Sequence, residues 1–66
     1  MKVKEKLIRE ARIRKDYKQH DIAHFLGVSQ SQYSKLENGE VHFDITQLGL
    51  LLDKLELNPL DVIQFS

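Results

Sequence analysis

The stretch from Gln19 to Gly39 constrains the fold of this chain more than any other. It contains two segments with apolar residues at helical spacing, joined by Gly27-Val28-Ser29. Apolar side chains that recur every three or four residues place one face of a helix in a core. Gly favours the left-handed conformation that ends many helices, and Ser is a good N-cap for the next one. The stretch therefore predicts two helices, Gln19–Leu26 and Gln30–Asn38, separated by a three-residue turn.

The two predicted helices differ in the quality of their N-cap residues. Ser29 precedes the second helix, and Gln32 stands where its side chain would complete a capping box. Lys18 precedes the first helix and is a poor N-cap, because an ammonium group offers no acceptor to the free amides. The residues that we expect these helices to bury are Ile22, Ala23, Phe25, Leu26, Tyr33 and Leu36.

Three further helices are predicted around this pair. They span about Lys4–Lys15, a segment that begins after Asp44, and a short segment from Pro59 to about Gln64, where Pro takes the first helical position. Val41-His42-Phe43 is the one candidate for extended structure. We therefore expect an all-α, compact five-helix domain that covers residues 1–66.

Two residues in these helices have unusual backbone roles. Asp16 follows the Lys4–Lys15 helix, and Asp tolerates the left-handed conformation of a helix end better than most residues. Gly49 lies inside the helix after Asp44, where it costs about 1 kcal/mol relative to Ala. Close approach of another helix would explain the glycine. The apolar stripe of that helix is expected to contain Ile45, Leu48, Leu51, Leu52 and Leu55.

The composition excludes several classes of protein. The chain contains no Cys, so it has neither disulfides nor thiolate metal sites. Its 41% hydrophobic and 30% charged residues are typical of a globular protein. The charged N-terminus lacks the apolar segment of a signal peptide, and the longest apolar run, Leu50–Leu52, is too short to span a membrane. We expect a soluble, cytoplasmic protein with no membrane contact.

The net charge of zero conceals a strong charge asymmetry. Residues 1–35 hold nine of the ten Lys and Arg residues against four acids, whereas residues 36–66 hold six acids and Lys54. Such an asymmetry predicts one face that meets a polyanion and another face turned away from it. Chance clustering on a solvated surface is the alternative.

The sequence contains no pattern typical of a catalytic or cofactor site. His20 and His24 are four residues apart, a spacing at which two imidazoles can share a metal, but no third ligand stands at a matching offset. No His and acid accompany a Ser as they would in an activated nucleophile, and there is no Gly-rich nucleotide loop. We expect no enzyme activity, metal or cofactor, and we interpret the two histidines as surface residues.

The outward face of the helix Gln30–Asn38 carries side chains suited to DNA. The major groove of B-form DNA admits one α-helix, in which Gln pairs with adenine, Lys with guanine, and Ser with either. Gln30, Ser31 and Lys35 lie within about a turn and a half of one another on this face. The free amides at the start of Gln19–Leu26 suit a phosphate. For any one of these residues, a solvated polar face is the alternative.

The stretch as a whole has the pattern Gln19-x-x-Ile22-Ala23-x-x-Leu26-Gly27-Val28-Ser29-x-Ser31-x-Tyr33-Ser34-Lys35-Leu36-Glu37-Asn38-Gly39. This pattern resembles that of the phage repressor and Cro (XRE-type) helix-turn-helix family. It implies a lambda-repressor-like domain with its helix-turn-helix core at about 19–39. It also implies a small transcriptional regulator that binds a double-stranded DNA operator. We expect a homodimer, because symmetric half-sites double the contacts of a weak single domain, and repression by occlusion, because 66 residues leave no room for an effector domain.

The resemblance further implies roles for individual residues. Those that face bases are Gln30, Ser31 and Lys35. Those that contact the DNA backbone or the groove edge are Gln19, Gln32, Ser34 and Asn38. We add Lys18 to this second set because of its own charge and not because of the resemblance. Arg12 and Glu37 are implied to form a structural ion pair that orients the helix Gln30–Asn38. That pairing has its own physical reason, because a partly buried carboxylate needs a partner.

Three positions depart from the family pattern. Lys18 replaces the usual Ser, Thr or Asn cap and adds a charge that attracts phosphate. Tyr33 replaces a small β-branched or aliphatic residue, so we expect its ring in the core and its hydroxyl at the surface. The loop Glu40–Asp44 lacks the basic residues with which many relatives hold the DNA backbone. Two domains on one DNA site would compensate for that loss.

A protein-interaction module is the main alternative function. The acidic second half and the terminal apolar residues Ile63 and Phe65 would then serve assembly with a protein partner, as in antitoxins that bind both a partner and DNA. A third possibility is the N-terminal domain of a longer regulator. Steep loss of binding with rising salt would favour DNA as the partner.

Overall fold

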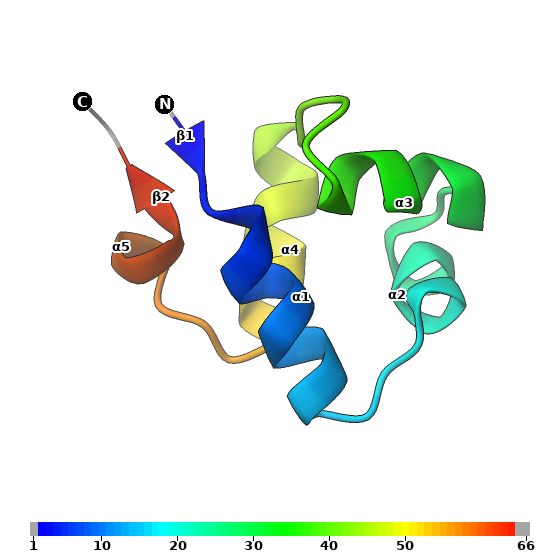
Figure 1. Ribbon diagram of the computed structural model, residues 1–66, viewed down its shortest axis with the longest axis horizontal. Helices are drawn as coiled ribbons and strands as arrows, with labels where there is room; N and C mark the ends of the chain where they lie inside the picture. The colour runs from blue at the N-terminus through cyan, green and yellow to red at the C-terminus, as the bar shows by residue number, and fades with distance from the viewer. Residues whose placement is uncertain (1, 65–66) are drawn as a thin grey trace.

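The computed structural model describes residues 2–64, and within this range the chain forms five helices and two short strands (Figure 1). In chain order these are β1 (Lys2–Val3), α1 (Glu5–Arg14), α2 (Gln19–Leu26), α3 (Gln30–Glu37), α4 (Ile45–Lys54), α5 (Pro59–Val62) and β2 (Ile63–Gln64). The prediction of a compact five-helix fold is confirmed. Across residues 2–64, no helix combines the length and the apolar character needed to cross a bilayer.

The two strands pair with each other and bring the ends of the described chain together. Their pairing is antiparallel, with Lys2 opposite Gln64 and Val3 opposite Ile63 (Figure 1). The expectation that extended structure would occur only at Val41–Phe43 is therefore wrong, since that segment forms no strand. Two residues are too few for an alternating pattern to be visible in a sequence. Their pairing depends instead on the helices that bring them side by side.

The pairing of β2 shortens α5 relative to the prediction. The helix begins as expected, with the side chain of Asn58 accepting a hydrogen bond from the Leu60 amide at 3.0 Å. It ends at Val62, because Ile63 is already extended. Ile63 is buried in the core and is not available to a partner. The proposed role of Phe65 in assembly concerns a residue outside the described range.

The core lies where the five helices meet. In Figure 1, α1 and α4 form the centre of the molecule, with α2 and α3 on one side and α5 with the strands on the other. Helix α2 packs against α3 and α4, and α1 packs against α3 and α5. The buried apolar side chains are Ile8, Ala11, Ile22, Ala23, Tyr33, Leu36, Phe43, Leu48, Leu51, Leu52, Leu55, Val62 and Ile63.

Two apolar residues that were expected in the core are exposed. Phe25 on α2 is 41% exposed and Ile45 on α4 is 71% exposed. Phe25 lies between the core stripe and the polar face of a helix with only two turns. The Nζ of Lys54 lies 4.5 Å from the centroid of the Phe25 ring and covers part of it by a cation–π contact. Ile45 is the first residue of α4, so it has the helical spacing of Leu48 and Leu52 but lies a turn before the part of that stripe that the core buries.

The sequence-based predictions for Asp16, Gly49 and Asp44 have different outcomes in the structure. Asp16 adopts the predicted left-handed conformation, with φ 63°, and Glu56 does the same after α4, with φ 57°. The expected close helix approach at Gly49 is wrong, because a Cβ at this position would meet no described atom within 4 Å. Asp44 begins α4 as predicted, in a reciprocal capping box with Gln47.

Candidate nucleic-acid interface

The turn between α2 and α3 is fixed by backbone and capping hydrogen bonds. Gly27 ends α2 in the left-handed conformation, with φ 74°, as its position predicted. The amide of the next residue, Val28, donates to the carbonyl of Ala23 at 3.0 Å. The hydroxyl of Ser29 then accepts from the amide of Gln32 at 3.0 Å and starts α3. These bonds set α2 and α3 at a defined angle, visible on the right of Figure 1.

The N-termini of the two helices differ from the predicted capping. At α3 the Gln32 side chain makes no return bond to Ser29 among the described residues, so the capping box is only half formed. At α2 the poor cap Lys18 is compensated by Asp21, whose carboxylate accepts from the Lys18 amide at 2.8 Å. A carboxylate in the first turn also interacts favourably with the helix dipole. The α2 N-terminus is therefore better held than Lys18 alone indicates.

The three residues expected to face bases all reach solvent from α3. Gln30, Ser31 and Lys35 are all exposed. Ser31 and Lys35, one turn apart, lie on the side of α3 opposite the buried Tyr33 and Leu36. Gln30 is exposed because it is the first residue of the helix. Of the other expected contacts on this helix, Gln32 is exposed and Ser34 is partly buried. The structure therefore places a row of hydrogen-bonding side chains outward from a helix whose other face is fixed in the core.

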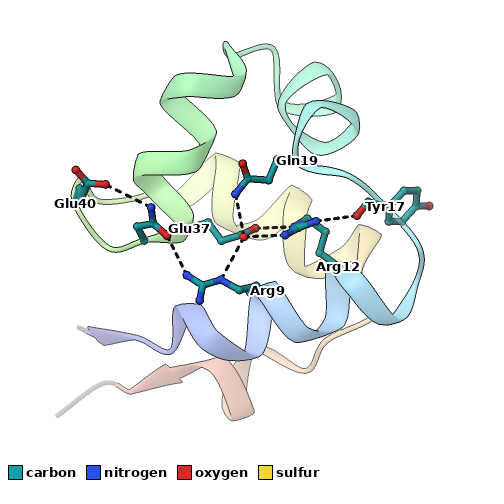
Figure 2. Close-up of polar contacts among 7 residues, drawn as sticks. Arg9, Arg12, Tyr17, Gln19, Glu37 and Glu40 are labelled. Atoms are coloured by element: carbon teal, nitrogen blue, oxygen red, sulfur yellow. Dashed lines mark hydrogen bonds and ion pairs between the residues drawn. The ribbon is translucent and has the colours of Figure 1, made fainter.

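A bidentate ion pair connects α3 to α1 (Figure 2). The Nε of Arg12 donates to Oε2 of Glu37 at 2.8 Å, and its Nη2 donates to Oε1 at 3.0 Å. The remaining Nη1 donates to the carbonyl of Tyr17 at 2.8 Å, in the loop before α2. Glu37 is 1% exposed and Arg12 is 9% exposed. One guanidinium thus joins α1, the loop and the end of α3.

The surroundings of this pair keep both groups charged. Burial by itself raises the pKa of Glu37, but the hydrogen bond from Arg12, the nearby Tyr33 hydroxyl and the hydrogen bond from Gln19 outweigh it and hold that pKa below its ordinary value. The hydrogen bond to Glu37 raises the pKa of Arg12 further, against the opposing effect of burial. An ion pair with this geometry and burial restrains the rotation and position of α3 relative to α1.

Two residues expected at the DNA backbone are bonded to the same cluster. The amide Nε2 of Gln19 donates to Oε1 of Glu37 at 3.3 Å, so this side chain is directed toward the ion pair (Figure 2). Asn38 follows α3, and its Oδ1 accepts from Nη2 of Arg9 at 3.0 Å. Its Nδ2 lies 3.5 Å from a carboxylate oxygen of Glu40. Lys18, the remaining residue of the set, is exposed.

Arg9 is part of this cluster and was not expected from the sequence. Its Nε lies 3.5 Å from Oε1 of Glu37, and its side chain is 45% exposed. Arg9 and Arg12 are three residues apart, a spacing that places two side chains on one face of a helix. That spacing was the signal that would have linked Arg9 to Glu37.

Tyr33 differs from its expected placement. The whole side chain is buried, and its hydroxyl has no hydrogen-bond partner among the described residues. The expectation of a hydroxyl at the surface is therefore wrong, because α3 packs too deeply against the core. Burial, and then the nearby Glu37 carboxylate, raise the pKa of Tyr33 well above its ordinary value. The tyrosine is neutral and adds an unsatisfied polar atom beside the ion pair.

The histidines of α2 lie at the surface. His20 and His24 are exposed, and Nε2 of His20 is 3.4 Å from a carboxylate oxygen of Asp21. Residues 2–64 contain no group of three or more His, Cys, Asp or Glu side chains arranged to hold a metal ion.

Two helices across a tight glycine turn, the second with a polar outward face and a fixed inward face, define a helix-turn-helix protein. A helix-turn-helix family model matches residues 8–62. The chain belongs to this family, the phage repressor and Cro-like (XRE-type) helix-turn-helix proteins, whose members are DNA-binding regulators and not typically enzymes. Comparisons with curated proteins and with solved structures gave no match.

Proposed function

We propose that this protein binds double-stranded DNA in a sequence-specific manner and reads the major groove with α3. The observation that carries the proposal is the exposure of Gln30, Ser31 and Lys35 on a helix whose other face is buried in the core. In the major groove, Gln pairs with adenine, Lys with guanine, and Ser with either base. The ion pair of Arg12 and Glu37 supports the same proposal, since base recognition requires a helix held in a fixed position.

Backbone contacts complete the proposed interface. Lys18 and the amides at the start of α2 would meet one phosphate, with Gln19 beside them. Gln32 and Ser34 would lie at the groove edge, and Asn38 near a phosphate at the end of α3. Gln19 and Asn38 are already hydrogen bonded within the protein, so each would approach DNA from a fixed position.

We propose that the binding form is a homodimer on a symmetric operator, acting as a repressor by occlusion. The loop Glu40–Asp44 contains no Lys or Arg. A single domain therefore has few basic side chains after α3 with which to bind the DNA backbone. Ile45, directly after this loop, is 71% exposed, and Leu60 on α5 is 77% exposed. Contact between two copies through these elements would bury both side chains. It would also present two copies of α3 to half-sites about one helical turn apart.

Selection of bound duplexes from random DNA, with the mass of the complex measured alongside, tests this function. The expected result is a palindromic sequence bound by two copies, with affinity that falls steeply as salt rises. Random output, with weak binding that is insensitive to salt, would contradict it. That outcome would favour the alternative, a protein-interaction or antitoxin-type module whose acidic C-terminal half binds a partner.

A further inference from the structure

The C-terminal end of α3 is surrounded by carboxylates. Glu37 lies inside this end, and the side chain of Glu40 is directed toward Asn38 (Figure 2). The carboxylate of Glu5 lies beside Gly39, where a Cβ would be 3.5 Å from it. The helix dipole adds further negative potential at a C-terminus. Arg12 already compensates the charge of Glu37, so the remaining negative potential comes from Glu5, Glu40 and the helix dipole. This end of the proposed reading helix would therefore repel a DNA phosphate unless a further cation lay beside it.

Arg9 supplies that cation. Its guanidinium comes from α1 and lies across the end of α3, at 3.5 Å from Glu37 and 3.0 Å from Asn38 (Figure 2). These contacts use Nε and Nη2, and a guanidinium has five N–H donors. At 45% exposure, the Arg9 side chain keeps part of its surface open to solvent, unlike that of Arg12 at 11%. Arg9 is therefore held by the protein and can still donate outward.

We propose that Arg9 is a DNA-backbone contact. In this proposal, which rests on the proposed DNA-binding function, its guanidinium uses the contacts with Glu37 and Asn38 as an anchor and donates to one phosphate at the C-terminal end of α3. Arg suits this task because its planar donors match phosphate oxygens and because holding them in place reduces the entropy lost on binding. Arg9 thereby replaces the basic residues that the loop Glu40–Asp44 lacks.

The test is the salt dependence of DNA affinity for Arg9→Met and for Arg14→Met as a matched control. Arg14 is an exposed residue of the same helix, and five residues of helix place it about 140° around the axis from Arg9. Both variants remove one charge, so only position distinguishes them. The probes are the duplex selected by the wild-type protein and an unrelated duplex of the same length.

The expected result for Arg9→Met is a salt slope smaller by about 0.9 per bound copy, the value for one lost phosphate contact. Affinity should fall roughly tenfold on both duplexes, because a phosphate contact carries no sequence information. Arg14→Met should keep the wild-type slope. Arg9→Lys should keep the slope and recover only part of the affinity, since it restores the charge without the planar donors.

Two results would overturn the proposal. A lower melting temperature with an unchanged slope would reduce Arg9 to a structural partner of Glu37 and Asn38. An equal loss of slope in Arg14→Met would show a general effect of charge. Both require that the wild-type protein binds DNA; if it shows no salt-dependent binding at all, the proposed function itself has failed.

Discussion

Arg12 and Glu37 are 25 residues apart in the chain and are joined by hydrogen bonds of 2.8 and 3.0 Å in the interior of the protein. Removal of one partner from a buried pair leaves the other charge without compensation, which costs about 3–5 kcal/mol. We expect Arg12→Met and Glu37→Gln each to lower the free energy of unfolding by at least about 2 kcal/mol, after allowance for the partial solvent access of Arg12. Arg14→Met is the control.

Urea unfolding of the two single variants and the double variant measures this coupling. The double variant should be more stable than the sum of the single losses predicts, because neither charge is then left alone. Additive losses would show that the two side chains do not interact in solution.

The depressed pKa of Glu37 makes the stability of the fold depend on pH. Although burial raises this pKa, hydrogen bonding to Arg12 lowers it below the ordinary value of 4.5. A carboxyl whose folded pKa is lowered stabilises the protein above its unfolded pKa, and this stabilisation is lost as pH falls through the folded value. We therefore expect wild-type stability to decrease below about pH 4.5 and the decrease to be smaller in Glu37→Gln.

A second carboxyl serves as the control for this pH dependence. The pKa of Glu56 is also lowered, by its hydrogen bond to Lys15, but Glu56 is exposed. High salt should therefore remove the contribution of Glu56 and leave most of that of Glu37. Identical pH profiles for Glu37→Gln and the wild type would contradict a stabilising charge at Glu37.

The Tyr33 hydroxyl is buried without a partner, so its removal should not harm the protein. An unsatisfied buried hydroxyl costs about 1–3 kcal/mol relative to water. We expect Tyr33→Phe to leave the free energy of unfolding unchanged or raise it by about 1 kcal/mol, measured in urea. A clear loss of stability would mean that the hydroxyl donates a hydrogen bond to Glu37 or to a water molecule.

Gly27 and Gly49 form a matched pair for substitution by alanine. A Cβ at either position would meet no described atom within 4 Å, but Gly27 has φ +74° and Gly49 is helical. Gly49→Ala should raise the free energy of unfolding by about 1 kcal/mol, because Ala is the better helix former. Gly27→Ala should lower it by about 1 kcal/mol, because the left-handed conformation disfavours a Cβ. Effects of the same sign in thermal unfolding would contradict the backbone assignment of one position.

Local chemistry explains what the sequence predicted well. Ser29, Asp44 and Asn58 are N-caps in the structure because each has a side-chain acceptor within reach of its own helix. Gly27 and Asp16 likewise adopt the left-handed conformation that their positions at helix ends indicated. These features depend on a few neighbouring residues, so they are visible without knowledge of the fold.

The errors concern contacts that depend on the three-dimensional arrangement. The strand pairing of Val3 with Ile63 requires the two ends of the chain to meet. Phe25 is apolar enough for the core, but its exposure depends on where α4 lies. In the sequence, Arg9 is one basic residue among several. Its contact with Asn38 depends on the position of α3 in the fold. The roles of Gln30, Ser31 and Lys35 toward bases remain predictions, since they depend on a DNA partner.

The measurement that most directly tests the central claim is the base preference of Lys35→Ala and Gln30→Ala at every position of the selected site. Exposed Thr46 on α4 supplies the control, as Thr46→Ala. If α3 reads bases, each of the two variants should lose about 1–3 kcal/mol of discrimination at one base position per half-site and keep the wild-type preference elsewhere. Equal weakening on every sequence, with the base preferences unchanged, would contradict the claim that this face of α3 reads DNA.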